Sequence, residues 1–90
     1  MGDAEIWRRL CALVSYHSGT PETALDGASS PRTTAGWDSV ANLGIMSAIE
    51  DEFAVTVSTR DVLRLRTLAD IAAYLEANQK LSERAGPPSS

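Results

Sequence analysis

A serine at the junction between a polar loop and an amphipathic helix is the residue best placed to do chemistry in this 90-residue chain. Small, turn-forming residues fill 18–35, the sequence Gly-Trp-Asp-Ser-Val occupies 36–40, and an amphipathic run follows to Phe53. Backbone N–H groups at the start of a helix have no intrahelical acceptor, so they face any anion bound there. We therefore interpret Ser39 as a covalent attachment point and Asp38 as the N-cap of the helix.

Other kinds of site find little support in the sequence. A serine hydrolase needs a base beside its nucleophile, and His17 is the only histidine in the chain. One cysteine, Cys11, excludes an intramolecular disulfide framework and a multi-cysteine zinc site. We therefore expect neither an enzyme nor a metal-binding protein.

The bulk composition indicates one domain of modest size. The hydrophobic fraction of 43% is ordinary for a globular chain. The net charge of −4 argues against nucleic acid, which favours basic patches. No apolar run approaches the roughly 18 residues of a membrane span, and the N-terminus lacks a signal-peptide pattern. We expect a cytoplasmic monomer that contacts neither membranes nor nucleic acid.

Helical periodicity and capping signals predict an all-α bundle of three main helices plus one short helix. The predicted helices span about 4–17, 39–53, 59–65 and 68–78, and residues 18–37 form a long loop between the first two. The predicted N-caps are Asp3, Asp38, Ser58 and Thr67. We expect residues 1–80 to form the domain and residues 81–90, which include Gly86-Pro87-Pro88, to form a disordered tail.

Apolar residues at helical spacing predict the core. They are Ile6, Leu10, Leu13 and Val14 with Trp7 and Cys11 at the core or its rim, then Leu43, Ile45, Met46, Ile49 and Phe53, and finally Leu68, Ile71, Ala72 and Leu75. Val40 lies on the same apolar stripe, but its position directly after Ser39 favours partner contact over core packing. Leu25 and Trp37 are expected to hold the long loop against this core. Gly44 in mid-helix costs about 1 kcal/mol relative to alanine, which indicates either a close helix approach or a small surface contact point.

The chain resembles the acyl carrier proteins and related peptidyl carrier domains at residues 36–40. Their mark is Gly-x-Asp-Ser-Leu or a close variant at the start of the second helix. The likeness continues downstream through residues 49–53 (Ile-Glu-Asp-Glu-Phe), Val55, Val57, residues 67–71 (Thr-Leu-Ala-Asp-Ile) and Tyr74-Leu75. The spacing from Asp38 to Leu75 matches the family pattern without a gap.

This resemblance implies a 4′-phosphopantetheine arm on Ser39, transferred from coenzyme A by a phosphopantetheinyl transferase. The arm would carry an acyl or aminoacyl group as a thioester to acyltransferase, ligase or synthase enzymes. In this family the Asp before the serine also assists the transferase, which implies a second role for Asp38. Two alternatives stay open: an aminoacyl or peptidyl carrier of a nonribosomal-peptide-like pathway, and an unmodified helical protein-interaction module.

The second helix departs from carriers of fatty-acid synthesis, which usually place acidic residues early in it. The corresponding positions here are small or neutral: Ala41, Asn42, Gly44 and Ser47. Residues 38–53 hold four acidic and no basic residues, whereas residues 54–80 hold four basic and three acidic ones. This mixed surface favours a dedicated partner of mixed charge over a general role in fatty-acid synthesis. The Trp-Asp-Ser form of the motif also resembles free-standing (type II) carriers, which implies a specialised, polyketide-like pathway.

The expected partner contacts surround the attachment point. They are Val40, Ser47, Glu50 and Asp51 on the second helix and Arg64 on the third. Glu50 to Glu52 form an acidic patch at the helix C-terminus, where the macrodipole disfavours negative charge. Docking to a partner and a plain solvated acidic face both account for that patch.

Overall fold

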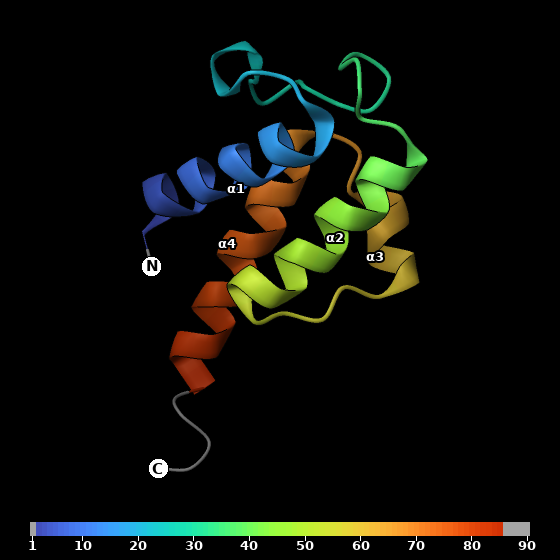
Figure 1. Ribbon diagram of the computed structural model, residues 1–90. Coiled ribbons are helices and arrows are strands. Elements are labelled where there is room, and N and C mark those ends of the chain that lie inside the picture. The colour runs from blue at the N-terminus through green and yellow to red at the C-terminus, as the bar shows by residue number, and fades with distance from the viewer. Residues whose placement is uncertain (1, 86–90) are drawn as a thin grey trace.

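The chain folds into four α-helices joined by a long first loop and two short links (Figure 1). The computed structural model describes residues 2–85, with the side-chain surroundings of residues 2–79. The elements are α1 (Asp3–Ser18), the 3-10 turn η1 (Glu22–Ala24), α2 (Ser39–Phe53), α3 (Thr59–Arg64) and α4 (Leu68–Ala85). The described residues contain no strand. The all-α, acyl-carrier-like bundle expected from the sequence, with its short third helix, is confirmed.

Helix α1 packs against both α2 and α4, and the core forms where the three long helices meet (Figure 1). Their buried side chains are Ile6, Leu10, Cys11 and Val14 from α1, Ile45, Met46, Ile49 and Phe53 from α2, and Leu68, Ile71, Ala72 and Leu75 from α4. Trp7 and Leu13 are half-buried at the edge of this core. Each fully buried Leu, Ile or Val contributes about 1.5–3 kcal/mol, so the packed helices supply most of the stability.

The predicted core is wrong in the first turns of α2, where apolar side chains are exposed. Leu43, expected in the buried stripe, is 72% exposed, and Val40 is 78% exposed. Burial on this helix begins only at Ile45. Helical periodicity identifies an apolar face but does not show how far along the helix a neighbouring element covers it.

Three of the four predicted N-caps are confirmed. The side chains of Asp38, Ser58 and Thr67 accept hydrogen bonds from backbone N–H groups of the first turns of α2, α3 and α4. The prediction for Asp3 is wrong: it is the first residue of α1, and Gly2 is the N-cap, without a side-chain hydrogen bond. Gly19 ends α1 in the left-handed conformation, as a helix C-terminus favours.

The predicted end of α4 near Asn78 is also wrong, since the helix continues to Ala85. Residues 79–85 contain no Gly or Pro, so nothing in the local sequence stops the helix before Gly86. The last turns of α4 therefore enter the segment predicted as a tail from residue 81, and residues 86–90 lie outside the described part of the chain. No helix within residues 2–85 is both long and apolar enough to cross a bilayer.

The long loop between α1 and α2 is fixed at several points. Trp37 is 2% exposed and Leu25 is half-buried against the core, as predicted. The loop also supplies two backbone acceptors to the start of α4, because Leu68 N–H donates to Ser29 O (2.8 Å) and Ala69 N–H donates to Gly27 O (3.0 Å). These bonds satisfy N–H groups that a helix cannot satisfy internally, and they fix the loop that leads to Ser39.

Candidate functional site

The turn before α2 brings the loop close to the end of α1. Gly36 has φ +85°, and a Cβ atom there would collide with the carbonyl oxygen of Ser18. Only glycine fits this backbone comfortably. The buried Trp37 follows, and its indole N–H donates to Asn42 Oδ1 at 2.9 Å. The loop is thereby locked onto the first turn of α2.

Asp38 and Ser39 have separate tasks at the start of α2. The extended Asp38 accepts the Ala41 N–H at Oδ1 (2.8 Å), and its carbonyl accepts the Asn42 N–H (2.8 Å). Ser39 is the first helical residue and is exposed. Within residues 2–79, its hydroxyl has no hydrogen-bond partner. The cap is thus provided by Asp38, and the Ser39 hydroxyl is accessible to a modifying enzyme.

The surroundings of Ser39 suit an anion. Within the described residues, the N–H groups of Ser39 and Val40 have no acceptor, and they lie at the positive end of the helix macrodipole. A shallow hollow of about 350 Å³ opens beside them, lined by Pro31, Arg32, Trp37, Asp38, Ser39 and Asn42. Arg32 was not identified in the sequence, because it joins the site only through the folding of a long loop.

The predicted partner contacts fall into two groups. Val40, Ser47 and Asp51 are exposed and share one face of α2, since residues seven and eleven positions apart return to the same side. Leu43 lies on that face as well, and the sequence interpretation assigned it to the core instead. Arg64 is exposed on α3. An apolar and polar surface therefore runs along α2 from the helix start at Ser39.

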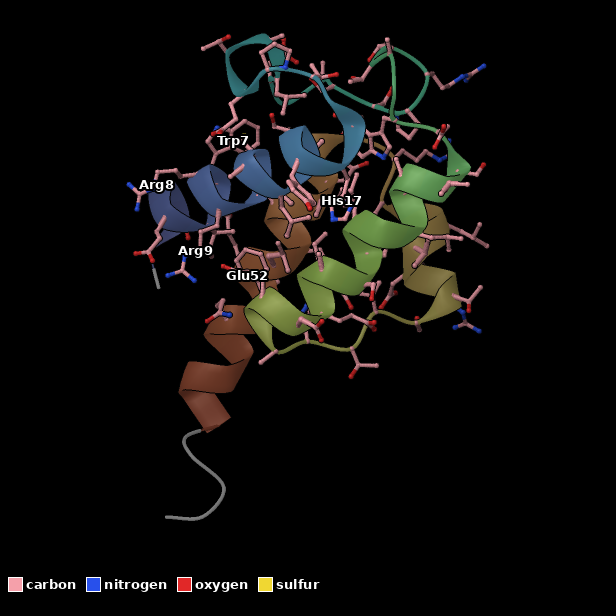
Figure 2. The ribbon with its side chains drawn as sticks, viewed as in Figure 1. Trp7, Arg8, Arg9, His17 and Glu52 are labelled. Atoms are coloured by element: carbon pink, nitrogen blue, oxygen red, sulfur yellow. The ribbon has the colours of Figure 1, made fainter. Side chains whose placement is uncertain are left out.

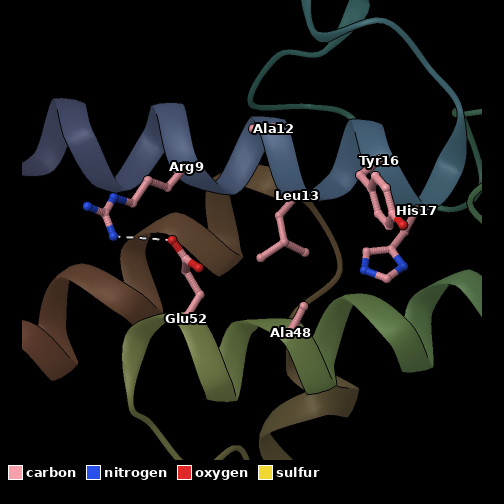
Figure 3. A pocket seen from close by; sticks show the side chains of 7 residues that line it. All are labelled: Arg9, Ala12, Leu13, Tyr16, His17, Ala48 and Glu52. Carbon is pink, nitrogen blue, oxygen red and sulfur yellow. Dashed lines mark hydrogen bonds and ion pairs between the residues drawn. The ribbon is translucent and has the colours of Figure 1, made fainter.

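Glu50 belongs to the second group, because its carboxylate is already engaged. It is half-buried, and Oε2 accepts the Val57 N–H at 2.8 Å, which holds the link between α2 and α3. Glu52 pairs with Arg9 of α1 at 3.2 Å (Figure 3). Of the predicted acidic patch, Asp51 alone forms no hydrogen bond or ion pair within the described residues.

A second hollow of about 440 Å³ lies between α1 and α2, away from Ser39. Figure 3 shows Leu13 and Ala48 facing each other across it, with the Arg9–Glu52 pair at one end and Tyr16 and His17 at the other. His17 points from α1 toward α2 (Figure 2), and a Cβ on Gly44 would come within 2.8 Å of His17 Nδ1. Of the two explanations for Gly44, the structure supports close approach.

Cys11 offers no alternative nucleophile. It is 6% exposed in the core. Burial, and secondarily the charge of Glu22, raise the pKa of its thiol, which disfavours the reactive thiolate. His17 lies on α1, and none of the residues around it lines the hollow at Ser39. The hollow at Ser39 is thus lined by one carboxylate, Asp38, and by no histidine or cysteine.

The family described as "Phosphopantetheine attachment site" matches residues 8–75, which is more than half of the chain. The chain belongs to this family. The cofactor of the family is 4′-phosphopantetheine, bound covalently, and its domains are generally non-catalytic carriers. They interact with a phosphopantetheinyl transferase and with the enzymes of a pathway. The family and the cofactor predicted from the sequence are confirmed.

The start of α2 fits this group chemically. A phosphodiester needs an exposed hydroxyl to be attached to and hydrogen-bond donors or cations for its charge. Ser39 offers the hydroxyl, the N–H groups of Ser39 and Val40 offer donors, and Arg32 lines the same hollow.

Proposed function

We propose that Ser39 carries the 4′-phosphopantetheine arm and that the chain is a carrier without catalytic activity of its own. It would shuttle an acyl intermediate between enzymes of a specialised, polyketide-like pathway, as a cytoplasmic monomer. The observation that carries this proposal is the exposed Ser39 hydroxyl at the first position of a helix whose cap is provided by another residue.

A separate phosphopantetheinyl transferase would attach the arm, as in the family to which the chain belongs. Ser39 Oγ forms a bond to the phosphorus of coenzyme A nearest the pantetheine, its proton passes to the transferase, and the nucleotide half of coenzyme A leaves. Asp38 has two roles in this proposal. It caps the first turn of α2, and, since it directly precedes Ser39, it assists the transferase at the reacting hydroxyl. When bound, the arm supplies a terminal thiol that holds acyl groups as thioesters.

The proposed partner surface comprises Val40, Ser47, Glu50 and Asp51 on α2 with Arg64 on α3. Its support is the exposure of four of these side chains, on α3 and on the helix that Ser39 opens, and the mixed charge of the two helices. Glu50 would contribute through the link that it holds at Val57 as well as through its charge. The scarcity of acid early in α2 favours a dedicated partner over the enzymes of general fatty-acid synthesis.

Incubation with coenzyme A and a phosphopantetheinyl transferase tests the attachment. The intact mass should rise by one arm, and Ser39→Ala should abolish the rise. Ser47→Ala is the matched control, because it removes an exposed serine from the same helix and should leave the rise intact.

Two results would contradict the proposal. One is a wild-type chain that several transferases leave unmodified. If this chain and Ser39→Ala also bind a partner with equal affinity, the result would favour an unmodified interaction module. The other is an arm that still attaches to Ser39→Ala. Loading of the modified chain by an amino-acid-activating enzyme, rather than by an acyl-transferring one, would instead identify an aminoacyl carrier.

A further inference from the structure

The hollow at Ser39 contains one cationic side chain, and the fold holds its backbone in place. Among the lining residues Arg32 is the only base and Asp38 the only acid. Arg32 lies within a turn closed by Thr33 N–H and Thr34 N–H on Ser30 O (3.1 and 2.9 Å), and its own N–H donates to Ser30 Oγ at 3.2 Å. Arg32 thus reaches the hollow from a defined turn, although it lies seven residues before Ser39.

Three other side chains of the hollow already form hydrogen bonds within the protein. Trp37 donates to Asn42 Oδ1, and the Asp38 carboxylate accepts the Ala41 N–H. By contrast, the Arg32 guanidinium forms no hydrogen bond or ion pair within the described residues. It therefore adds a cationic donor with capacity for a ligand to the free N–H groups of Ser39 and Val40.

Modification of Ser39 creates a need for that cation. A phosphodiester on Ser39 Oγ places a negative charge beside the carboxylate of Asp38, and like charges at short range repel. Asp38 cannot be dispensed with, because it caps α2. The positive end of the α2 macrodipole attracts the phosphate but carries no full charge to balance the two anions. A guanidinium in the same hollow binds phosphate through charge-assisted, often bidentate, hydrogen bonds.

A larger groove of about 620 Å³ continues from the hollow. The two share Pro31, Arg32 and Asn42, and the groove extends to α3 and the link after it. Its far part is formed by Val62, Leu63, Leu65, Arg66 and Thr67. No acidic residue lines it, although the chain carries a net charge of −4. Leu63 is 72% exposed, so it offers apolar surface at this end.

We propose that Arg32 binds the phosphodiester on Ser39 and thereby directs the arm into the groove toward α3. Arg32 is a positioning residue in this inference, which rests on the proposed attachment to Ser39. The phosphate would be bound by Arg32 and by the free N–H groups of Ser39 and Val40, and the pantetheine chain would lie against Leu63.

Phosphorus NMR of the modified chain tests the contact without any pathway enzyme. The wild type, Arg32→Gln and Arg32→Lys are compared with Arg60→Gln, an exposed arginine of α3 that lines neither cavity. In Arg32→Gln the ³¹P resonance should move toward that of free phosphopantetheine. Nuclear Overhauser contacts between the pantetheine methyl groups and Leu63 should disappear at the same time. Arg32→Lys should keep part of both signals, and Arg60→Gln should keep all of both.

Two results would overturn the inference: a ³¹P resonance unchanged by Arg32→Gln, or methyl contacts with Leu63 that persist without Arg32. Thermal unfolding of the unmodified variants serves as the folding control, and the exposed Arg32 should be replaceable without a change in Tm. Failure of the wild type to accept any arm would instead contradict the proposed function, so the two failures are distinguishable.

Discussion

Two adjacent residues at the start of α2 differ in role because one side chain cannot both cap a helix and be modified. A capping oxygen accepts a backbone N–H, as Asp38 Oδ1 does from Ala41, and a serine in that role would have its hydroxyl turned inward. Ser39 is one position further along and exposed. This division was predictable from the sequence, since capping depends on residues three positions apart.

The Trp37–Asn42 hydrogen bond should couple the loop to the attachment site. Asn42→Ala leaves the indole N–H of Trp37 without its acceptor, and Trp37→Phe leaves Asn42 Oδ1 without its donor. Each loss costs about 1–3 kcal/mol. The double variant should lose less than the sum of the two, because both singles break the same bond. Urea unfolding of the four proteins measures this, and strictly additive losses would show that the bond contributes nothing.

Gly44→Ala should reveal the contact with His17. An alanine in the middle of α2 gains up to about 1 kcal/mol of helix propensity over glycine. The new Cβ must displace the His17 imidazole, the mobile end of a side chain, so the net gain should be smaller than this. In a His17→Ala background the full gain should appear. Equal effects of Gly44→Ala in both backgrounds, measured by thermal unfolding, would rule the contact out as the reason for the glycine.

Two residues near the start of α2 could not be assigned correctly from the sequence: Arg32, which was not identified, and Leu43, which was expected in the core. Arg32 lines the same hollow as Ser39 from a loop that is fixed to α4 through Ser29 and Gly27, and these contacts join residues some forty positions apart. Leu43 fits the apolar period of α2, but no other element covers that turn of the helix. Both errors concern tertiary contacts, which a local pattern does not contain.

At the level of elements, α4 begins at a junction of three segments. Its capping box is reciprocal, because Asp70 N–H donates to Thr67 Oγ1 and Asp70 Oδ2 accepts the Thr67 N–H, each at 3.1 Å. Asp70 also accepts the Arg66 N–H at 3.1 Å. The hydroxyl of Tyr74, one turn later, donates to Asp61 of α3. The start of α4 therefore positions both the loop and α3, which flank the site.

Acid should weaken this junction through Asp70. The backbone N–H groups of Arg66 and Thr67 lower the pKa of Asp70, in that order of effect. Because its folded pKa is lowered, its stabilising contribution is complete above the ordinary value of 3.8 and is lost as pH falls through the lower folded pKa. The pH dependence of unfolding below 3.8, followed by circular dichroism, should therefore become shallower in Asp70→Asn.

The control for this measurement is Asp51→Asn. Asp51 is exposed, and its carboxylate accepts no hydrogen bond within the described residues. Asp51→Asn should leave the pH dependence of unfolding in acid the same as in the wild type. An equal change in both variants would attribute the effect to net charge and contradict the role of the capping box.

The elements themselves were largely predictable. The starts of α2, α3 and α4 follow from their capping residues, and the end of α1 follows from Gly19. The end of α4 was predicted too early because the tail composition was given more weight than the absence of a breaker before Gly86. The engagement of Glu50 by Val57 and of Glu52 by Arg9 depends on packing between elements, so a run of acidic letters could not reveal it.

In the molecule as a whole, exposed apolar side chains lie on the helix that begins at Ser39, the proposed attachment point. Val40 and Leu43 lie on the same face of α2 as Ser47 and Asp51, and Ser39 opens that helix. Exposed apolar side chains beside a functional group mark interaction sites more often than isolated ones do. We therefore expect partners to dock along α2.

Leu43→Gln should slow transfer of cargo to and from partner enzymes. A truncated apolar contact at the centre of an interface costs about 1–2 kcal/mol of binding, roughly a five- to thirty-fold loss in affinity. The Tm should not fall, because Leu43 is 72% exposed. Tyr16→Gln on α1, 84% exposed, is the matched control and should transfer normally. Similar losses in both variants would mean that α2 is not the docking helix.

Locating the arm within the chain would show whether it is attached to Ser39. Cleavage after arginine releases the peptide 33–60, which contains Ser39, Ser47 and Ser58. Fragment masses of this peptide, from protein produced with a transferase, should assign the added mass to Ser39. Assignment of the arm to Ser47, to Ser58 or to another peptide, or the absence of any arm, would contradict the account.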